Sequence, residues 1–393
     1  MIRIGIVLPS VPIYSETFFR SKISALLRNG FEVILFVKNP NGANNFICPV
    51  KVHPKVSANA FIRPLQTVLL FAKLLLRAPK PSFRMLQITR KQNYTLFQAI
   101  RAAVIGSAIL PERLDWLHFG FAATAIEREY VGKAIGARVA VSFRGFDINQ
   151  TPLMDGNLYK KFWPNVDKAH SISKYLLIKA RELGLSEKTP FSIITPAIDI
   201  QRFSPKPHQR EPNSILLVSR LHWIKGIEQV LEAAAMLKAE GIALHLAIAG
   251  EGEELERLLF ARYQLGLMEE VSFLGRKSSD EIIELMQCHD VFIQYSHQEG
   301  FCNAALEAQA SGMLCVVSDA DGLIENVLHA QTGWVVPKRN PKALAKKLQE
   351  VFILSDTEKD TIRNQARNRI VKCFDLKNQE KEFVHFYTDI INT

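Results

Sequence analysis

The sequence predicts an α/β protein with two doubly wound, parallel-sheet domains. Three observations support this: a length of 393 residues, short apolar runs that alternate with helical patterns, and a proline-rich break near the middle. Domains usually contain about 100–200 residues, so two domains are expected. Strands that alternate with helices form parallel sheets, because each crossover helix brings the chain back to the same edge.

The first half carries six apolar runs that are expected to form strands. The first helix is expected at residues 16–29, where Gly30 ends it, and a long helical insertion is expected at 60–109. The expected strands are residues 2–8, 32–37, 116–119, 138–143, 168–172 and 191–194.

The second half starts after residues 203–213, whose three prolines predict a linker. We therefore expect one domain at residues 1–205 and another at 206–374. Both are predicted to be Rossmann-like and to face each other across a cleft, and ligands should bind beyond the carboxyl ends of the strands. The expected strands of the second domain are residues 215–218, 243–249, 271–274, 291–294, 315–318 and 334–336.

Composition excludes several classes of protein. The chain is 48% hydrophobic and 22% charged, which is typical of a globular protein. Its five cysteines form no CxxC pair and its ten histidines show no HExxH spacing, so neither a disulfide framework nor a metal site is expected. The apolar start is too short for a signal peptide, so a cytoplasmic protein is expected.

Positive charge is concentrated in the first half. Eleven Lys and Arg residues and no acidic residue lie between Glu32 and Glu112. Over residues 61–77 the cations alternate with Leu, Val and Phe, as in a surface helix on anionic lipid at the inner face of a membrane. A core helix with solvated cationic ends explains the pattern equally well. Nucleic-acid binding ranks last, because no recognition motif accompanies the charge.

A pair of carboxylates carries the strongest chemical signal. Glu299 follows the strand predicted at 291–294, and Glu307 lies about one turn into the next helix. Carboxylates accept hydrogen bonds from vicinal hydroxyls, as recognition of a sugar or ribose requires. The helix start near Asn303 and Ala304 offers free backbone N–H groups to an anion.

Two cations follow the first strand of the second domain. Arg220 can bind two oxygens at once and Lys225 supplies a point charge, so together they suit a diphosphate. Gly250 and Gly252 form a GxG turn after the next strand, which alone is a weak signal because any tight βα connection favours glycine.

These motifs, in this order, resemble the retaining GT-B glycosyltransferases of the family-four type, and the resemblance covers residues 215 to about 338. The first half is similar to the exopolysaccharide, colanic-acid-type branch, through the segments 12–18, 117–120 and 141–147. The resemblance implies that the last helix, within residues 375–393, returns to the first domain, which would bind the acceptor.

The resemblance also implies roles for matching residues. Arg220 and Lys225 would hold the donor diphosphate, Glu307 the ribose hydroxyls and Glu299 the transferred sugar. His118 would lie near the reacting centre, on the donor-sugar side. Further donor-binding positions would be Gly250, Gly252, Phe301, Cys302, Asn303, Ala304 and Arg276.

The implied reaction retains the anomeric configuration and needs no metal or protein base, because cations stabilise the leaving group. No cofactor is expected beyond the co-substrate, a UDP- or GDP-sugar. The implied acceptor is a saccharide or lipid-linked oligosaccharide of cell-surface polysaccharide biosynthesis. Epimerisation or hydrolysis of a nucleotide sugar, or a non-catalytic sugar-nucleotide-binding protein, are the alternatives.

Several first-half residues have two interpretations each. Arg144 stands where many relatives carry His, and it would meet a phosphate or an anionic acceptor. Asp147 is either a cleft residue or a turn-forming residue, and Glu16 either orients acceptor hydroxyls or lies in a helix cap formed by Ser15. His118 could also be a satisfied core histidine. In the second half, relatives often have Gly-Gly where this chain has Asp-Gly before residue 323, and Cys302 has the character of a packing residue without a basic partner.

Overall fold

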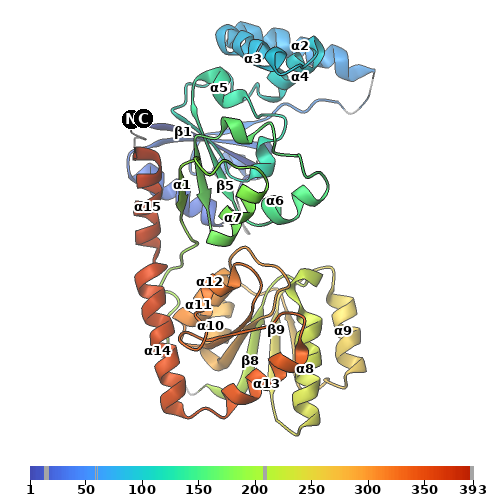
Figure 1. The fold of residues 1–393 in the computed structure, drawn as a ribbon, viewed down its shortest axis with the longest axis vertical. Coiled ribbons are helices and arrows are strands. Elements are labelled where there is room, and N and C mark those ends of the chain that lie inside the picture. The colour runs from blue at the N-terminus through green and yellow to red at the C-terminus, as the bar shows by residue number, and fades with distance from the viewer. Residues whose placement is uncertain (13–16, 58, 60, 207–209, 390–393) are drawn as a thin grey trace. The chain divides into compact units, whose positions relative to one another are not determined.

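The computed structural model describes residues 1–12, 17–57, 59, 61–206 and 210–389. The chain forms two compact units, one made of Met1–Ile194 with Glu380–Thr393 and the other of Thr195–Gln379 (Figure 1). The divisions fall at 194/195 and 379/380, whereas the sequence suggested 205/206 and 374/375. Each unit contains one parallel sheet, so the prediction of two Rossmann-like α/β domains is confirmed.

The first unit has a seven-stranded parallel sheet in the order β3-β2-β1-β4-β5-β6-β7. All six predicted strands of this half are present, two of them with the predicted bounds and four with end shifts of one or two residues. The short strand β3 was not predicted, because its three residues include a lysine and none is buried. The strands are β1 (Arg3–Ser10), β2 (Glu32–Asn39), β3 (Val50–Val52), β4 (Trp116–Phe119), β5 (Arg138–Phe143), β6 (Lys168–Ser171) and β7 (Phe191–Ile193).

Helices α1, α5 and α7 pack on this sheet, and the predicted insertion forms three further helices of this unit. One of the three, the insertion's last helix, begins with a capping box in which the Thr95 side chain accepts from the Gln98 N–H group and Gln98 accepts from the Thr95 N–H group. The helices are α1 (Thr17–Arg28), α2 (Ile62–Arg77), α3 (Pro79–Lys91), α4 (Leu96–Ile105), α5 (Val131–Ile135), α6 (Phe146–Asn149) and α7 (Lys174–Glu182).

The C-terminal helix α15 (Leu376–Thr388) completes the core of the first unit. Its Phe383, Phe386 and Tyr387 are buried against β1, β2 and Trp116 of β4. The Trp116 indole N–H group donates to the carbonyl oxygen of Tyr387 at 3.2 Å. Burying each large aromatic side chain contributes about 1.5–3 kcal/mol, so the end of the chain is a structural part of the first unit.

The second unit has a six-stranded parallel sheet in the order β10-β9-β8-β11-β12-β13. All six predicted strands are present. The strands are β8 (Glu211–Val218), β9 (His245–Ala249), β10 (Val271–Gly275), β11 (His289–Gln294), β12 (Leu314–Ser318) and β13 (Trp334–Val336). The helices are α8 (Ile227–Ala239), α9 (Leu255–Gln264), α10 (Ser279–Cys288), α11 (Asn303–Ala310), α12 (Leu323–Asn326), α13 (Pro341–Phe352) and α14 (Asp356–Cys373).

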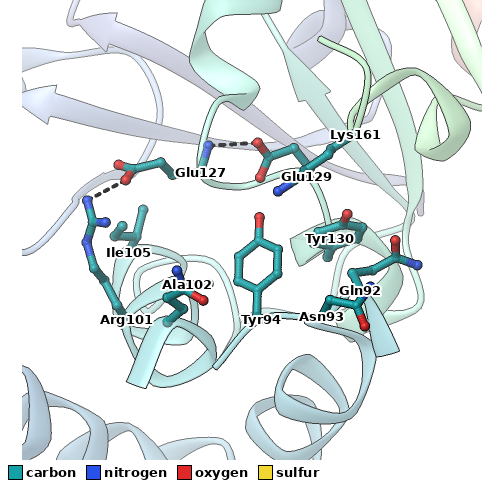
Figure 2. A pocket seen from close by; sticks show the side chains of 11 residues that line it. Gln92, Asn93, Tyr94, Arg101, Ala102, Ile105, Glu127, Glu129, Tyr130 and Lys161 are labelled. Carbon is teal, nitrogen blue, oxygen red and sulfur yellow. Dashed lines mark hydrogen bonds and ion pairs between the residues drawn. The ribbon is translucent and has the colours of Figure 1, made fainter. Parts of the chain in front are cut away.

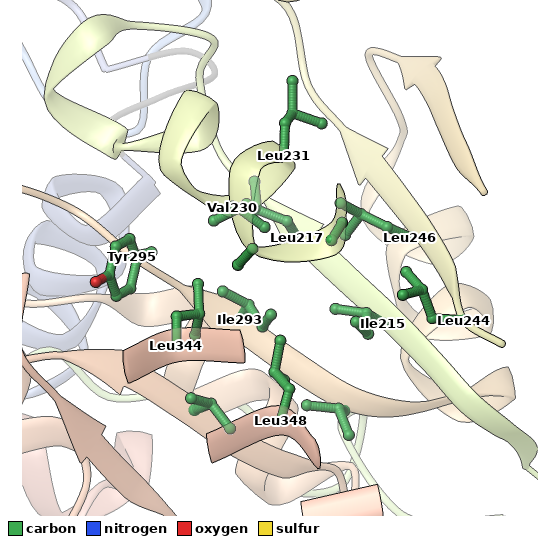
Figure 3. Packing of buried hydrophobic residues seen from close by; sticks show 14 of the residues in the cluster. Ile215, Leu217, Val230, Leu231, Leu244, Leu246, Ile293, Tyr295, Leu344 and Leu348 are labelled. Carbon is green, nitrogen blue, oxygen red and sulfur yellow. The ribbon is translucent and has the colours of Figure 1, made fainter. Parts of the chain in front are cut away.

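The core of the second unit lies between the sheet and the helices α8 and α13. Leu217 on β8 and Ile293 on β11 pack with Leu231 of α8 and with Leu344 and Leu348 of α13 (Figure 3). The chain leaves β8 toward β9 on one side, while β11 lies on the other side and continues toward β12. Strand order therefore reverses between β8 and β11, and a ligand is expected at this switch point.

Over the described residues, none of the helices combines the length and the apolar character needed to cross a bilayer.

Candidate active site

The loops that follow β8 and β11 bring the two strongest candidate residues into contact. The Nζ atom of Lys225 lies 2.5 Å from Oε2 of Glu299, and each side chain is only 15% exposed. The Ser296 hydroxyl donates to the same carboxylate oxygen at 3.1 Å. The sequence places these two charges 74 residues apart, and the switch point brings them together as an ion pair.

Glycine at position 226 allows this contact. Gly226 has φ 63°, and a Cβ atom there would lie 2.2 Å from the carbonyl oxygen of Tyr295 at the end of β11. The N–H group of His297 donates to the carbonyl oxygen of Ile224 at 2.7 Å. The loop that carries Lys225 therefore rests directly on the loop that leads to Glu299.

The two glycines of the GxG turn support the Arg220 loop. Gly250 has φ 151°, and a Cβ atom there would lie 1.8 Å from the carbonyl oxygen of Ser219. A Cβ atom on Gly252 would lie 2.2 Å from the carbonyl oxygen of Leu221. Any side chain would thus displace the loop that presents Arg220, whose side chain is exposed. These glycines fit the close approach of two loops.

The loop that follows β12 packs against the Glu299 loop. The N–H group of Gly322 donates to the carbonyl oxygen of Glu299 at 2.9 Å, and a Cβ atom on Gly322 would lie 2.0 Å from the carbonyl oxygen of Gly300. Of the pair Asp321-Gly322, the second position is the one that steric contact restricts to glycine. At the first position, where relatives often have glycine, this chain has Asp321 with φ 37°, and the loop accommodates it.

The N-terminus of α11 opens beside these loops. The helix follows Cys302, and the side chain of this N-cap residue makes no capping hydrogen bond. Asn326 holds Cys302 on both sides, because its side chain accepts from the Cys302 N–H group and donates to the Cys302 carbonyl oxygen, each at 3.0 Å. The first-turn N–H groups at Asn303 and Ala304 thus remain available to an anion.

Glu307 lies one turn along α11 from Asn303, so both project from the same face of the helix. Its side chain is half-buried. Burial raises the pKa of the Glu307 carboxyl to about 7, while the Arg202 guanidinium opposes that rise. Arg202 in turn pairs with Asp280 at 2.7 Å. Glu307 is therefore a carboxyl group that changes charge near neutral pH.

Three further donor-binding candidates have other environments. Burial raises the pKa of the Cys302 thiol to about 12, which agrees with a packing residue and excludes a thiolate nucleophile. The Phe301 ring is buried and packs against Phe374, with centroids 5.9 Å apart. Arg276 is exposed and donates to Glu251 of the glycine turn at 3.3 Å.

His118 is fully buried inside the first unit. Its Nε2 atom lies 2.7 Å from the Ser142 hydroxyl, and its Nδ1 atom lies 2.6 Å from the Tyr387 hydroxyl and 3.5 Å from Nζ of Lys22. Burial, followed by the nearby Lys22 amine, lowers the pKa of His118 well below its ordinary value. Both ring nitrogens are occupied within this unit, so the geometry favours the core-histidine interpretation over a donor contact.

Asp147 organises the loop after β5. It is 1% exposed, and its carboxylate accepts from the N–H groups of Ala122 at 2.9 Å and of Arg144 and Gly145 at 3.1 Å each. This geometry favours the turn-forming interpretation. The Arg144 guanidinium lies 3.8 Å above the Phe18 ring, a cation–π contact. The proposed acceptor residue Glu16 lies outside the described residues.

A separate cavity of about 410 Å³ lies in the first unit, between α4 and the segment before α5 (Figure 2). The Tyr94 side chain points toward Glu129 within it, and Lys161 lies 4.7 Å above the Tyr94 ring. None of the predicted site residues that the structure describes lines this cavity. Among the residues that the structure describes, no cluster of His, Cys, Asp or Glu could hold a metal ion.

Several supporting residues were missed at the sequence level. Ser296 and Asn326 carry no motif of their own, and their roles depend on contacts 3 to 24 residues away. The need for glycine at position 322 was likewise not predicted. Glycine in a loop after a strand was a usable signal for it, because Gly226 and Gly252 perform similar tasks.

Comparison with known proteins shows which proteins the chain resembles. Residues 199–369 match the family "Glycosyl transferases group 1". The chain is 27% identical over 405 residues to WcaL of Escherichia coli (strain K12), named for colanic acid biosynthesis, covering 97% of this chain and 98% of the relative. It is 28% identical over 238 residues to a Campylobacter jejuni N,N'-diacetylbacillosaminyl-diphospho-undecaprenol alpha-1,3-N-acetylgalactosaminyltransferase, covering 57% of this chain and 60% of that relative.

Solved structures show the same fold. Anabaena HepE in complex with UDP superimposes with a TM-score of 0.75 at 16% identity, over 99% of this chain and 100% of that structure. The whole architecture is thus that of the GT-B enzymes, and the matched domain contains every second-half candidate residue. Residues 199–369 match a group 1 glycosyltransferase domain, and the chain is a glycosyltransferase with the GT-B fold.

Proposed function

We propose that the protein is a retaining glycosyltransferase that transfers a sugar from a nucleoside diphosphate donor to a saccharide or lipid-linked oligosaccharide in cell-surface polysaccharide biosynthesis. The observation that carries this proposal is the Lys225–Glu299 pair at the switch point, beside the uncapped start of α11. A UDP-sugar is the favoured donor, because the related HepE structure holds UDP, and a GDP-sugar is the alternative.

The donor diphosphate binds to three kinds of group. Lys225 supplies a nearly buried positive charge, Arg220 supplies an exposed guanidinium, and the first turn of α11 supplies backbone N–H groups. Such fixed donors stabilise the negative charge that develops on the leaving diphosphate, because they need no reorganisation during the reaction. Gly250 and Gly252 keep the Arg220 loop in place.

The two carboxylates bind hydroxyl groups of the donor. Glu299 is oriented by Lys225 and Ser296, which both contact its Oε2 atom, and its other oxygen accepts from the transferred sugar. Glu307 accepts from the ribose hydroxyls once it is ionised, and its half-buried position makes those hydrogen bonds strong. Arg276 belongs to the same donor side, near the nucleoside.

The reaction proceeds on one face of the sugar. The bond from the anomeric carbon to the diphosphate oxygen breaks, the acceptor oxygen forms its bond on the same face, and the acceptor proton passes to the departing phosphate. Lys225 and Arg220 stabilise the diphosphate as its charge grows. No step requires a protein base or a metal ion.

The two domains divide the substrates. Residues 206–374 bind the donor, while residues 1–205 with the C-terminal segment 375–393 bind the acceptor, to which Arg144 contributes. The relative from Campylobacter jejuni is named for a diphospho-undecaprenol acceptor. A lipid-linked acceptor places the enzyme at the inner face of the cytoplasmic membrane, and the basic stretch before Glu112 supports that location.

A thermal-shift titration with UDP, GDP, ADP and their sugars, with and without EDTA, tests the proposal. Selective stabilisation by one nucleotide, unchanged by EDTA and lost in Arg220→Ala, is the expected result. Breakdown of the donor without any acceptor would instead indicate a hydrolase or epimerase. Tight donor binding without turnover on any acceptor would contradict catalysis.

A further inference from the structure

Helix α2 has an apolar face that the described protein leaves uncovered. The helix buries Thr67 and Leu74 on one side. On the other side, leucines and their neighbours recur at the spacing of one helical face, and they are 55–93% exposed although all are large and apolar. This surface, which we call the α2 face, consists of Phe61, Ile62, Leu65, Leu69 and Leu76.

Basic side chains border the α2 face. Lys73 follows Leu69 by four residues and precedes Leu76 by three, so it lies on the same side of the helix. All the lysines and arginines of α2 and α3 are exposed, and within the part of the chain that the structure describes none of them forms an ion pair. The bordering cations are Arg63, Lys73, Arg77, Lys80, Arg84, Arg90 and Lys91.

The surrounding sequence supplies no acidic residue to offset this charge, since residues 33–111 contain none. Figure 1 shows α2, α3 and α4 as a layer beyond α5, away from β1, and α2 packs on α3 and α4. A contact made by this layer would therefore leave the sheet of the first unit undisturbed.

The chemistry of the α2 face indicates its partner. Leucine and phenylalanine side chains enter the boundary between headgroups and acyl chains, while lysine and arginine extend their long stems to reach anionic headgroups. A nucleic acid would use the cations but would leave the leucines in water. We propose that α2 lies flat on an anionic lipid bilayer, with the α2 face inserted into the interface.

This inference deepens the membrane part of the proposed function, because it names the surface that brings the enzyme to a lipid-linked acceptor. It predicts that binding depends both on anionic lipid and on the leucine side chains. It also predicts that α2 contributes nothing to nucleotide binding, since the donor residues belong to the second unit.

Co-sedimentation of the full chain with phosphatidylcholine vesicles, with and without phosphatidylglycerol, tests this inference at low and high salt. Two variants change exposed α2 side chains alone, so the fold should persist. The cation variant should bind anionic vesicles about 100-fold more weakly, at about 1 kcal/mol for each of three basic residues. The leucine variant should bind anionic vesicles at least about tenfold more weakly than the wild type. The variants are Arg63→Gln/Lys73→Gln/Arg77→Gln and Leu65→Gln/Leu69→Gln/Leu76→Gln.

Matched controls change equally exposed side chains elsewhere. Both should bind vesicles like the wild type, and all four variants should keep the thermal shift that UDP causes. The controls are Lys342→Gln/Lys346→Gln/Lys372→Gln and Leu153→Gln/Met154→Gln/Ile353→Gln.

Three outcomes would overturn the inference. Equal sedimentation with neutral and anionic vesicles would exclude an anionic partner. Undiminished binding by the leucine variant would exclude insertion of α2. Self-association of the wild type that only the leucine variant abolishes, without vesicle binding, would assign the α2 face to a second copy of the chain. A retained UDP shift in any of these cases would leave the proposed donor site intact.

Discussion

Glu307→Gln should stabilise the enzyme, and increasingly so as the pH rises. In the folded protein, burial raises the pKa of Glu307 from 4.5 to about 7. Below pH 4.5 the carboxyl is protonated in both the folded and the unfolded chain, so burial then costs little. Between pH 4.5 and 7 the unfolded chain ionises more readily, and the folded state loses stability. Glutamine resembles the protonated carboxyl at every pH and avoids this loss.

The size of the effect follows from the two pKa values. Their difference, from 4.5 to about 7, corresponds to about 3 kcal/mol at pH 8 and about 1 kcal/mol at pH 5. In a domain of about 150–250 residues, 1 kcal/mol shifts the melting temperature by about 2–4 °C. Glu307→Gln should therefore melt roughly 6–12 °C above the wild type at pH 8 and only about 2–4 °C above it at pH 5.

Differential scanning fluorimetry from pH 4.5 to 8 measures the difference in melting temperature between Glu307→Gln and the wild type. The unfolding transition to follow is the one whose midpoint UDP shifts. Glu256→Gln, which changes an exposed carboxylate on α9, is the matched control and should melt with the wild type throughout. A melting difference between Glu307→Gln and wild type that stays constant with pH would refute the reasoning. If Glu307 binds the sugar nucleotide, its replacement should also weaken UDP binding. The melting temperature should then rise while the affinity for UDP falls.

Three further predictions, made with four substitutions and one control, test the site and the core. Lys225→Met and Glu299→Gln should each lower kcat by about 10²–10³-fold with an unchanged circular dichroism spectrum, and wild-type turnover in either folded variant would remove that residue from the mechanism. Gly226→Ala should lose UDP binding, because its Cβ atom would strike a carbonyl oxygen. Gly241 also has a positive φ, but no described neighbouring atom lies within 4 Å of an added Cβ atom there, so Gly241→Ala should lower the free energy of unfolding by only about 1–2 kcal/mol and keep UDP binding. An equal loss of UDP binding in both variants would contradict the steric argument. Tyr387→Phe should lower the free energy of unfolding of the first unit by about 1–3 kcal/mol in urea while UDP affinity stays unchanged, and a loss of UDP affinity would contradict its purely structural role.

The strands and the site loops could be predicted because their signals are local. Strands β9 and β12 of the second unit are short, mainly apolar runs, and in a parallel sheet such runs are buried on both faces. Residues that follow those runs must lie at the carboxyl edge of the sheet. That topological fact predicts that the loops of Lys225 and Glu299 lie at the same edge of the sheet, although 74 residues separate the two residues, whereas their assignment to one donor came from the family resemblance.

The environment of His118 could not be predicted, because its partners are distant in the chain. Ser142 lies 24 residues away and Tyr387 lies 269 residues away, on the C-terminal helix. A histidine at the end of a buried strand has the same local pattern whether it faces a ligand or the core. Only the return of α15 to the first unit places the Tyr387 hydroxyl on its Nδ1 atom.

The glycines connect the motif to its geometry. A GxG turn is weak sequence evidence because many tight turns prefer glycine, yet Gly250, Gly226 and Gly322 each place a backbone carbonyl oxygen within 2.2 Å of where a Cβ atom would lie. Four loops, which follow β8, β9, β11 and β12, thereby approach one another with no side chain at these three glycines. A diphosphate spans only a few ångströms, so charges from separate loops can act on it together only when the loops approach this closely. The glycines and the charged residues therefore form one functional unit, in which the glycines set the distances and the charges supply the chemistry.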